Sequence, residues 1–169
     1  MSIASLSRNQ LAALLQVAKA DSHRNWLIIH TGWRHGLRAS EAVSITAEQV
    51  CDGYLTVQRL KGSLRTCQPC SRELSEFARG KTGRLFTIQR RQLDNIVKKY
   101  GKFAGIPRHL AHSHACFKHT AAVLGLEGGM QISELQAYLG HVSGSSTLQY
   151  LKVSEDAASK AFERAVGGL

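Results

Sequence analysis

The sequence predicts an α+β fold that is mostly helical and contains one small antiparallel sheet of about three strands. Apolar residues recur at helical spacing along most of the chain, and an Asp52-Gly53 pair joins two runs of residues that favour strands. Of the 169 residues, 43% are hydrophobic, which is enough to form a core. This composition excludes a disordered, collagen-like or low-complexity chain.

Two helices are expected before the sheet. A Ser-Arg-Asn-Gln capping-box pattern at 7–10 precedes an apolar stripe and predicts a first helix over 7–20. A second helix is expected to begin near Asp21 or Ser22 and to end at Gly36. Shorter helical turns are expected at 40–44 and after Thr46.

The predicted sheet follows these helices. Residues 50–51 precede the Asp52-Gly53 turn, and a longer run of strand-favouring residues follows at 54–60. An Asp-Gly pair between such runs is a strong signal for a hairpin. Lys61-Gly62-Ser63 predicts a second turn, after which 64–70 is expected to return as the third strand.

The chain after Pro69 is expected to be helical and divided by breaks that contain glycine. The predicted helices cover 71–79, 89–104, 112–125, 131–139, 146–151 and 154–165. The sequence contains no internal repeat, no low-complexity tract and no long linker. We therefore expect residues 1–169 to form a single domain.

The positive charge of the chain is concentrated in one segment. The net charge is +10 at neutral pH, and the segment 79–108 contains nine basic residues and one acidic residue, Asp94. Such a field attracts a polyanion, as phosphate-binding faces of nucleic-acid proteins do; a merely solvated basic helix face is the alternative. The candidate DNA-binding residues are Arg84, Arg90, Arg91, Lys98 and Lys99.

The four cysteines and the apolar runs argue against zinc-binding and membrane-spanning proteins. Cys67-Gln-Pro-Cys70 has the spacing of half a zinc site, but no clear second pair completes it, so we favour ordinary reduced thiols and no metal. No apolar run approaches the roughly 20 residues that cross a bilayer. No secretion signal precedes the first helix. We expect a cytoplasmic protein.

The familiar motifs of nucleotide, hydrolase and zinc-protease sites are missing from the sequence. What it offers instead is a dispersed set of cations and one tyrosine. The set consists of Arg38, Lys61, His114, Lys118, His141 and Tyr150.

Three stretches of this set resemble the tyrosine recombinases of the phage integrase family. Gly36-Leu-Arg-Ala-Ser-Glu41 is similar to the first arginine motif of that family, and Lys61-Gly62 is similar to its β-hairpin lysine. Leu139-Gly-His141, with Tyr150 nine residues later, resembles its closing histidine and nucleophile. The order and spacing fit over about residues 7–165, and the resemblance implies the fold of a tyrosine-recombinase catalytic domain.

The chemistry implied by the resemblance agrees with the residue types. Several positioned donors are needed around a phosphate that gains charge, and the fork of Arg38 suits that task. Glu41 would hold Arg38 or a histidine, with a surface salt bridge as the alternative. Lys61 would protonate the leaving oxygen, unless it is an ordinary turn lysine. His141 would donate a hydrogen bond to the phosphate, and Tyr150 would attack it, although tyrosines in terminal helices usually pack.

The central motif departs from the usual His-x-x-Arg-His of the family. Lys118 stands where the second arginine is expected, and Ala115 stands at the histidine position. His114 lies four residues before Lys118, and on an α-helix this offset shares a face. A lysine keeps the charge but loses the two-pronged geometry. His112 and His119 are reserve candidates, each more typical of a structural or solvent-facing histidine.

The resemblance predicts a site-specific DNA recombinase that cleaves and rejoins strands through a 3′-phosphotyrosyl intermediate, without ATP, metal or other cofactor. The departures at Ala115 and Lys118 keep a noncatalytic or weakly catalytic DNA-binding module as the alternative. The expected partners are double-stranded DNA, further copies of the chain on DNA and accessory DNA-bending proteins. We accordingly expect association with the nucleoid.

The resemblance also concerns the two ends of the chain. The amino-terminal core-binding domain of the family is expected to be absent, because the sequence begins almost at the catalytic domain. Residues 154–166 would form a terminal helix that is either exchanged between protomers or folded back on its own domain.

Overall fold

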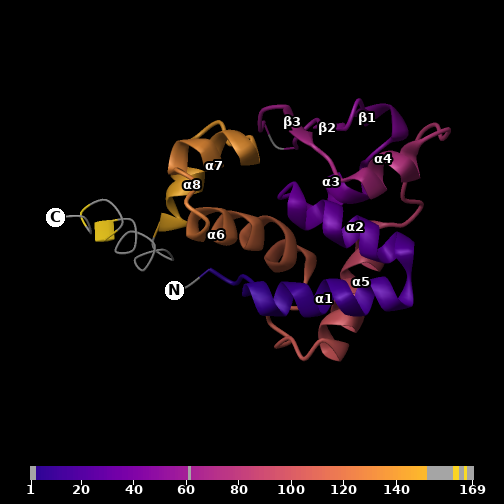
Figure 1. Cartoon of the computed structure of the whole chain (residues 1–169), viewed down its shortest axis with the longest axis horizontal. Helices are drawn as coiled ribbons and strands as arrows, with labels where there is room; N and C mark the ends of the chain where they lie inside the picture. Colours follow the sequence, from indigo (N-terminus) through magenta and orange to yellow (C-terminus); the bar gives the residue numbers. More distant parts are fainter. Residues whose placement is uncertain (1–2, 61, 152–161, 164–165, 167–169) are drawn as a thin grey trace.

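The computed structural model describes residues 3–60, 62–151, 162–163 and 166. Its helices and its sheet follow one another along the chain as Figure 1 shows. The helices before the sheet are α1 (Arg8–Asp21), α2 (His23–Arg34), α3 (Ala39–Ser44) and a 3-10 turn (Ala47–Gln49). Those after it are α4 (Arg72–Ala78), α5 (Arg90–Phe103), a π-helical turn (Ala115–His119), α6 (Thr120–Glu127), α7 (Ile132–Leu139) and α8 (Ser145–Leu148).

The beginnings of the first two helices are fixed by serine caps. The Ser7 hydroxyl accepts from the backbone N–H of Gln10, and the Gln10 side chain accepts from the N–H of Ser7, so the predicted capping box is confirmed. Ser22 caps α2 in the same way through the N–H of Asn25. The chain leaves α2 through Gly36, whose φ of +56° favours glycine.

The sheet has the predicted order and direction but shorter strands. Strands β1 (Val50–Cys51), β2 (Tyr54–Val57) and β3 (Thr66–Pro69) pair antiparallel in the order β1-β2-β3. Leu55 lies opposite Gln68 and Val57 opposite Thr66. The arms beyond β2 and before β3 leave the ladder because their polar groups bond to other parts of the fold.

Buried apolar residues form two clusters that meet along one continuous helix. The larger cluster draws on α1 to α5 and includes Phe117 of the π-helical turn. The smaller cluster lies among α6, α7 and α8 and includes Leu135, Leu139 and Tyr150. The π-helical turn and α6 therefore connect the two clusters, and Figure 1 shows α6 extending from α2 toward α7 and α8.

Close packing of this connection explains a glycine inside α2. A Cβ at Gly32 would lie 2.6 Å from the ring of Phe117. Gly32 is thus the place where the π-helical turn packs directly against α2.

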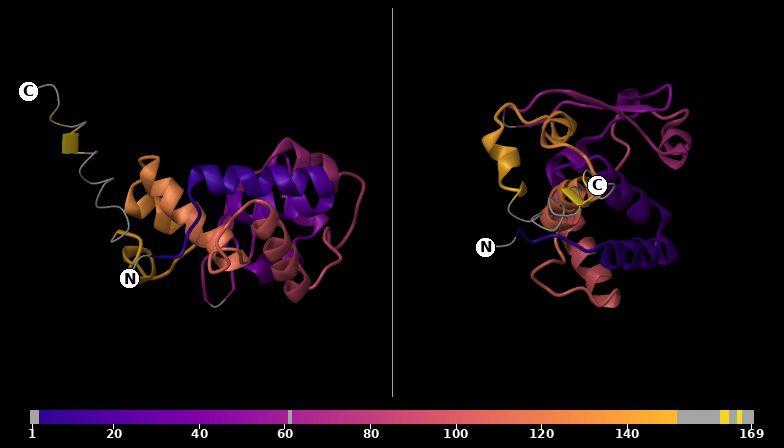
Figure 2. Two further views of the ribbon diagram at one scale, coloured as in Figure 1. Left: turned by 90° about the horizontal axis from the view of Figure 1, so that it is seen from below. Right: turned by 60° about the vertical axis from the view of Figure 1, so that its left-hand side comes forward.

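The first residues of the chain run beside the smaller cluster. Ile3 packs against it, and the N–H of Leu6 donates to the Thr120 hydroxyl at 2.9 Å. Figure 2 shows this stretch passing close to α6 and α8. Among the described residues, no helix is both long and apolar enough to cross a membrane.

Candidate active site

A polar pocket of about 370 Å³ lies among the start of α3, the hairpin after β2, the π-helical turn and the loop after α7. Three of the predicted cations line it: Arg38, Lys118 and His141. They come from the start of α3, the π-helical turn and the end of α7. Residues more than 100 positions apart in the sequence therefore surround one space that would accommodate a phosphate group.

Arg38 enters the pocket from a fixed position. Its Nη1 donates to Oε1 of Glu41 at 2.8 Å and to the carbonyl of Leu60 at 3.2 Å. Burial opposes ionisation of Glu41, but backbone N–H groups of Arg38 and Leu60 and the charge of Arg59 together hold its pKa below the usual range. A charged Glu41 thus orients the guanidinium of Arg38 and is itself 2% exposed, so it is no surface salt bridge.

Lys118 is buried beside the positive charges of Arg38 and Arg59. The residue is 8% exposed. Burial, reinforced by Arg38, lowers the pKa of Lys118 to about 8. The charge of Glu41 acts in the opposite direction, and an anion in the pocket would likewise favour the charged ammonium.

The helix around Lys118 is wound differently from the α-helix expected at this place. Hydrogen bonds in a π-helix run from i to i+5, so its turn contains one residue more than an α-turn. The extra residue between His114 and Lys118 is accommodated in this wider turn. The expectation that the two side chains share an α-helical face is therefore wrong in its geometry, since the backbone between them is not α-helical.

His141 follows Gly140, the residue that caps the end of α7, and its ring is held by a hydroxyl. Its Nδ1 and Oγ1 of Thr147 lie 2.8 Å apart. Burial, with Lys118 and Arg38, lowers the pKa of His141 to about 4, so the imidazole is neutral at pH 7. When the Thr147 hydroxyl donates to Nδ1, Nε2 carries the proton, and a neutral His141 can still donate to a phosphate oxygen.

Gly140 allows the loop that contains His141 to approach the hairpin. Its φ is +67°, and a Cβ there would lie 2.6 Å from the carbonyl oxygen of Leu64. The carbonyl of Gly140 also accepts from the N–H of Leu64 at 2.8 Å. The hairpin and the histidine loop are consequently in backbone contact.

Replacing Gly140 with alanine should destabilise the protein by more than the ~1–2 kcal/mol that a left-handed alanine costs. The added methyl group cannot fit against Leu64 without moving the backbone. Gly105→Ala is a matched control, since Gly105 has a φ of +66° and open space around its Cβ. Denaturant unfolding of both variants measures the difference; equal losses would show that the close approach contributes nothing.

Tyr150 lies next to the pocket but is buried in the smaller apolar cluster. It is 1% exposed, while the preceding Gln149 lines the pocket. Burial raises the pKa of Tyr150 to about 12, and the positive charge of Arg38 acts in the opposite direction. The charge of Arg38 thus acts on the phenol, but the segment that contains Tyr150 has to move before the phenol can enter the pocket.

A row of aromatic rings leads from Tyr150 to the predicted histidine of the central motif. The Tyr150 ring meets His119 edge-on at 5.8 Å, and His119 lies 4.0 Å from His114 between ring centroids. The Nδ1 of His119 donates to the carbonyl of Ala4 at 3.2 Å. His114 is exposed and does not line the pocket; it faces this row of rings instead.

Two predicted features fall on residues outside those that the structure describes. Lys61 is one, although its neighbour Gly62 lines the pocket. The terminal helix expected at 154–165 is the other, apart from residues 162 and 163.

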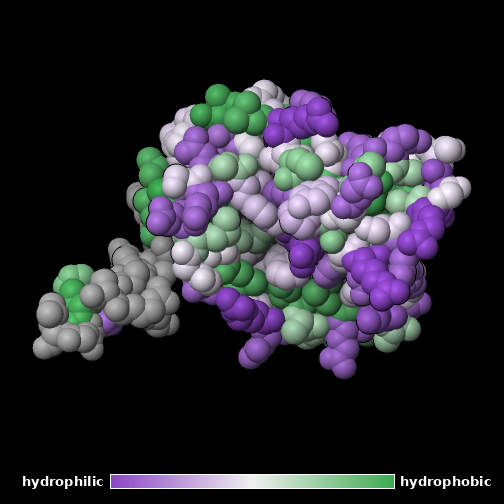
Figure 3. Space-filling model, turned by 45° about the horizontal axis from the view of Figure 1, so that its top comes forward, coloured by the Kyte–Doolittle hydropathy of each residue, from purple (hydrophilic) through white to green (hydrophobic). Residues whose placement is uncertain are grey.

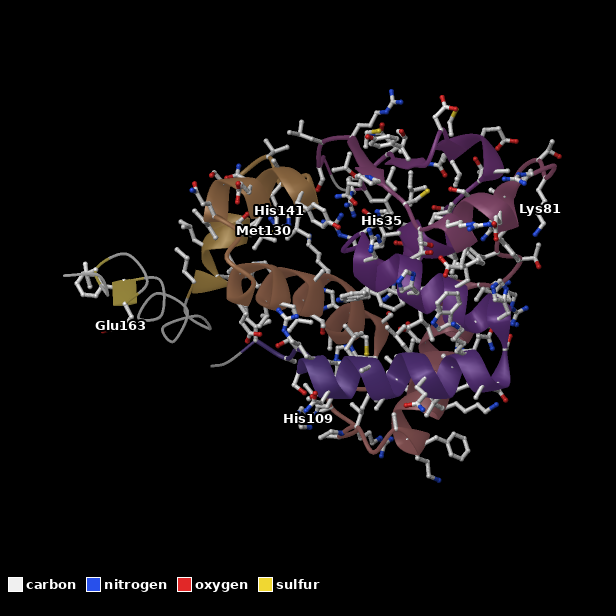
Figure 4. All side chains as sticks on the ribbon, viewed as in Figure 1. His35, Lys81, His109, Met130, His141 and Glu163 are labelled. Atoms are coloured by element: carbon white, nitrogen blue, oxygen red, sulfur yellow. The ribbon has the colours of Figure 1, made fainter. Side chains whose placement is uncertain are left out.

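The basic segment does not form one continuous face. Lys81, near one end of the segment, and His109, just beyond the other end, lie far apart in Figure 4. Strongly hydrophilic side chains are scattered over the face shown in Figure 3. The guanidinium of Arg84 donates to the carbonyl of Val43 at 2.9 Å, so part of this charge holds the fold together.

The other basic residues of this segment divide between pairing and solvent. Lys99 pairs with Asp21 at 3.2 Å, and Arg90 lies 3.9 Å from Asp94. Lys98 lines a separate pocket of about 500 Å³ with Lys102 and Arg108. Arg91 is exposed.

Sequence reasoning missed the residue that connects the parts of this site. Arg59 lies in the predicted strand 54–60, and in the structure it is buried and bonds to Glu41. The signal was present, because alternation from Leu55 and Val57 places residue 59 on the buried face. The pocket-lining hydroxyls of Ser143 and Ser146 were also missed.

Comparison with known proteins adds an independent observation to this geometry. The sequence matches the phage integrase family over residues 4–156. The chain belongs to this family. This integrase-family chain is 32% identical to tyrosine recombinase XerA of Pyrococcus furiosus over 182 residues, which cover 95% of the chain and 61% of XerA. It thus spans about three fifths of the length of that relative.

Solved structures support the same assignment of fold. The catalytic domain of bacteriophage HP1 integrase superposes with a TM-score of 0.74 at 25% identity, covering 96% of this chain and 95% of that domain. The XerH recombinase bound to its difH substrate before cleavage superposes with a TM-score of 0.74 at 21% identity, over 94% of this chain and 52% of XerH. The predicted fold, a mostly helical tyrosine-recombinase catalytic domain with a three-stranded antiparallel sheet, is confirmed.

Proposed function

We propose that this chain is the catalytic domain of a site-specific DNA recombinase that cleaves and rejoins strands through a 3′-phosphotyrosyl intermediate. One observation carries the proposal: Arg38, Lys118 and His141 line a single pocket, and Tyr150 lies directly beside it in a chain of the integrase family. The proposed roles of these residues rest on their chemistry and placement.

In the proposed reaction, Oη of Tyr150 forms a bond to the phosphorus of a DNA backbone phosphate. The bond from phosphorus to the 5′ oxygen breaks, the tyrosine proton leaves to solvent or a nearby base, and Lys61 supplies a proton to the leaving 5′ oxygen. The 3′ phosphate remains joined to Tyr150. A 5′ hydroxyl of another strand reverses the step, so the energy of the phosphodiester is conserved in the ester.

The charge of the pocket matches the demand of this reaction. Arg38, Arg59 and Lys118 contribute three positive charges near a single buried carboxylate, Glu41. The excess positive charge is suited to the oxygens of a phosphate that gains negative charge in the transition state. The neutral His141 adds a hydrogen bond without further repulsion among the cations.

Tyr150 has to leave its buried position for the attack. Its segment is short: α8 comprises Ser145–Leu148, between the loop of His141 and the tyrosine itself. We propose that bound DNA favours a rotation of this segment that brings the phenol toward Arg38. Interactions with the bound phosphate would then offset the free energy of the apolar contacts that Tyr150 loses.

Lys118 gives the reaction a pH dependence that an arginine would not. Since the pKa of Lys118 is about 8, the side chain is mostly charged at pH 7 and mostly neutral at pH 9. The measurement is the cleavage rate at subsaturating DNA, divided by the rate of the Lys118→Arg variant at the same pH. This ratio should fall about tenfold from pH 7 to pH 9. The ionisation of Tyr150 at high pH is common to both proteins and cancels in the ratio. A ratio that stays constant from pH 7 to pH 9 would contradict this role of Lys118.

Double-stranded DNA is the proposed substrate, and other copies of the chain are the proposed partners on it. A DNA-bound XerH and a lambda integrase dimer bound to a core site share this fold, which supports the proposal. Exposed cations such as Arg91 and Lys98 would contact the phosphate backbone. Accessory DNA-bending proteins belong to the same proposal.

The experiment uses a pool of nicked duplexes with a randomised core. When a strand is cut a few nucleotides from the nick, the short fragment that carries the released 5′ hydroxyl diffuses away. The strand cannot then be rejoined, so the covalent intermediate accumulates. The protein is incubated with the pool and denatured, and DNA that stays attached is recovered and sequenced. The pool assumes no target in advance. Because the proposed enzyme is site-specific, we expect the recovered DNA to share a sequence.

Failure to recover attached DNA, under conditions in which the folded protein shifts the same duplexes on a native gel, would contradict the proposal. It would favour the noncatalytic DNA-binding module instead.

A further inference from the structure

Thr147 is a fully buried threonine that the reaction described above does not use. It lies in α8 and is 0% exposed. Its Oγ1 lies 2.8 Å from Nδ1 of His141, and its carbonyl accepts from the N–H of Tyr150 at 3.0 Å. One residue therefore contacts both the histidine that lines the pocket and the proposed nucleophile.

The backbone of His141 is held by α7, whereas its ring is held by α8. The N–H of His141 donates to the backbone carbonyl of Gln136 at 3.0 Å, and Nε2 of Gln136 donates to the carbonyl of His141 at 3.2 Å. These two bonds fix the backbone but leave rotation about the side-chain bonds of His141 open. Within the described part of the chain, the Thr147 hydroxyl is the hydrogen-bonding partner of the imidazole, so it sets the direction of the ring.

The direction of this hydrogen bond follows from the burial of the hydroxyl. A hydroxyl carries one proton to donate, and a buried O–H without an acceptor is costly. Among the described residues, Nδ1 of His141 is the acceptor that Thr147 Oγ1 reaches. The hydroxyl therefore donates, Nδ1 supplies its lone pair, and the proton of the neutral ring is on Nε2.

The position of the ring proton decides whether His141 attracts or repels a phosphate. A phosphate oxygen is an acceptor, so an N–H attracts it and a nitrogen lone pair repels it. Because Thr147 engages Nδ1, Nε2 is the nitrogen left to face the pocket that His141 lines. A ring turned by half a rotation would present a carbon-bound hydrogen there, and a ring protonated on Nδ1 would present a lone pair.

Packing alone does not explain a hydroxyl at this position. Valine has nearly the shape of threonine and would fill the same buried space without a polar group that needs a partner. The feature that distinguishes threonine here is its bond to the imidazole.

We propose that Thr147 is a positioning residue that holds His141 with its Nε2–H directed at the reacting phosphate. This inference deepens the proposed recombinase function and rests on it. Since the N–H of Tyr150 bonds to the carbonyl of Thr147, a movement of Tyr150 that leaves His141 in place has to begin after Thr147.

The first test observes the ring of His141 without DNA. Protein with nitrogen-15 in its histidines is studied by NMR at pH 7, where correlations between ring nitrogens and ring C–H protons distinguish the two neutral tautomers. The His141→Gln variant identifies the signals of this residue by their disappearance. We expect the wild-type ring to carry its proton on Nε2. A proton on Nδ1 would overturn the inference, whatever the protein does to DNA.

The second test measures single-turnover cleavage. Thr147→Val should slow it about tenfold, less than the ~100-fold that loss of a whole oxyanion donor costs, because the imidazole remains but is no longer aimed. Thr147→Ser restores the hydroxyl and should recover most of the rate. Thr31→Val is the matched control, since Thr31 is a buried threonine of α2 whose hydroxyl has no partner among the described residues. It should cleave within about twofold of wild type.

A double variant separates positioning from structural support. If Thr147 acts through His141, adding Thr147→Val to His141→Ala should cost nothing further. An undiminished loss in that background, or a Thr147→Val protein that cleaves like wild type, would overturn the inference.

If Thr147→Val does not fold, the tautomer of the wild-type ring still decides. A wild-type protein that shows the expected tautomer but never attaches to DNA would contradict the proposed function instead. The two failures are therefore distinguishable.

Discussion

Tyr150→Phe is expected to abolish covalent attachment to DNA and to leave DNA binding and folding almost unchanged. Phenylalanine keeps the ring that packs against His119 and the smaller apolar cluster, so the change in unfolding free energy should stay below about 1 kcal/mol. It removes the oxygen that would attack phosphorus. Loss of a nucleophile typically costs at least about 10⁴-fold in rate, which places the adduct below detection.

Two measurements check this prediction on the same sample. Denaturing gels quantify attached DNA, and native gels quantify binding at a fixed salt concentration. Tyr54→Phe serves as the control, because Tyr54 lies on β2 and is 48% exposed. Attachment that persists in Tyr150→Phe and disappears in Tyr54→Phe would assign the nucleophile to the sheet and contradict the account.

Arg38→Ala is expected to produce the second largest loss, about 100- to 1,000-fold in single-turnover cleavage at saturating DNA. The guanidinium is aimed at the pocket by Glu41 and would bond to phosphate oxygens that gain charge in the transition state. The fold should persist, because Arg59 remains paired with the buried Glu41. Arg38→Lys should recover only part of the rate, since a lysine lacks the fork.

The control for Arg38 is a cation outside the pocket. Arg72 pairs with Glu76 on the surface of α4, and Arg72→Ala should leave the cleavage rate within about twofold of wild type. An Arg38→Ala protein that cleaves as fast as Arg72→Ala would show that the pocket does not bind the reacting phosphate.

Local signals in the sequence were sufficient for most of the fold. The capping box at Ser7, the Asp52-Gly53 turn and the glycine breaks each act through nearby residues, and the helices and the sheet formed where they indicated. The strands were predicted too long. Their outer residues have strand-like side chains, but the arm after Val57 turns toward Glu41 and α7, a tertiary effect that no local pattern contains.

The sequence predicted three residues that line the site, but it did not predict the backbone geometry around Lys118 or the burial of Tyr150. Spacing and resemblance selected Arg38, Lys118 and His141, and these three line one pocket. The π-helical turn around Lys118 packs through Phe117 against Gly32, a contact between segments far apart in the sequence that no local pattern reveals. The burial of Tyr150 depends on how its segment folds back on α6 and α7, and no spacing of residues in the sequence shows this.

Arg59 marks the point where sequence reasoning fell short for a physical reason. A charged residue in a strand is usually solvated, and its buried position is stable only because Glu41 and three backbone carbonyls surround it. Alternation along β2 pointed to the buried face, but the partners that make such burial tolerable come from α2, α3 and α7.

The most direct measurement for the central claim is peptide mapping of the covalent complex by mass spectrometry. The complex formed on a nicked duplex is digested with protease and nuclease, and the modified peptide is sequenced. The account predicts a single modified residue, Tyr150, joined to a phosphate on the 3′ side of the cleaved strand. A link to any other residue, or to the 5′ side of the break, would contradict it.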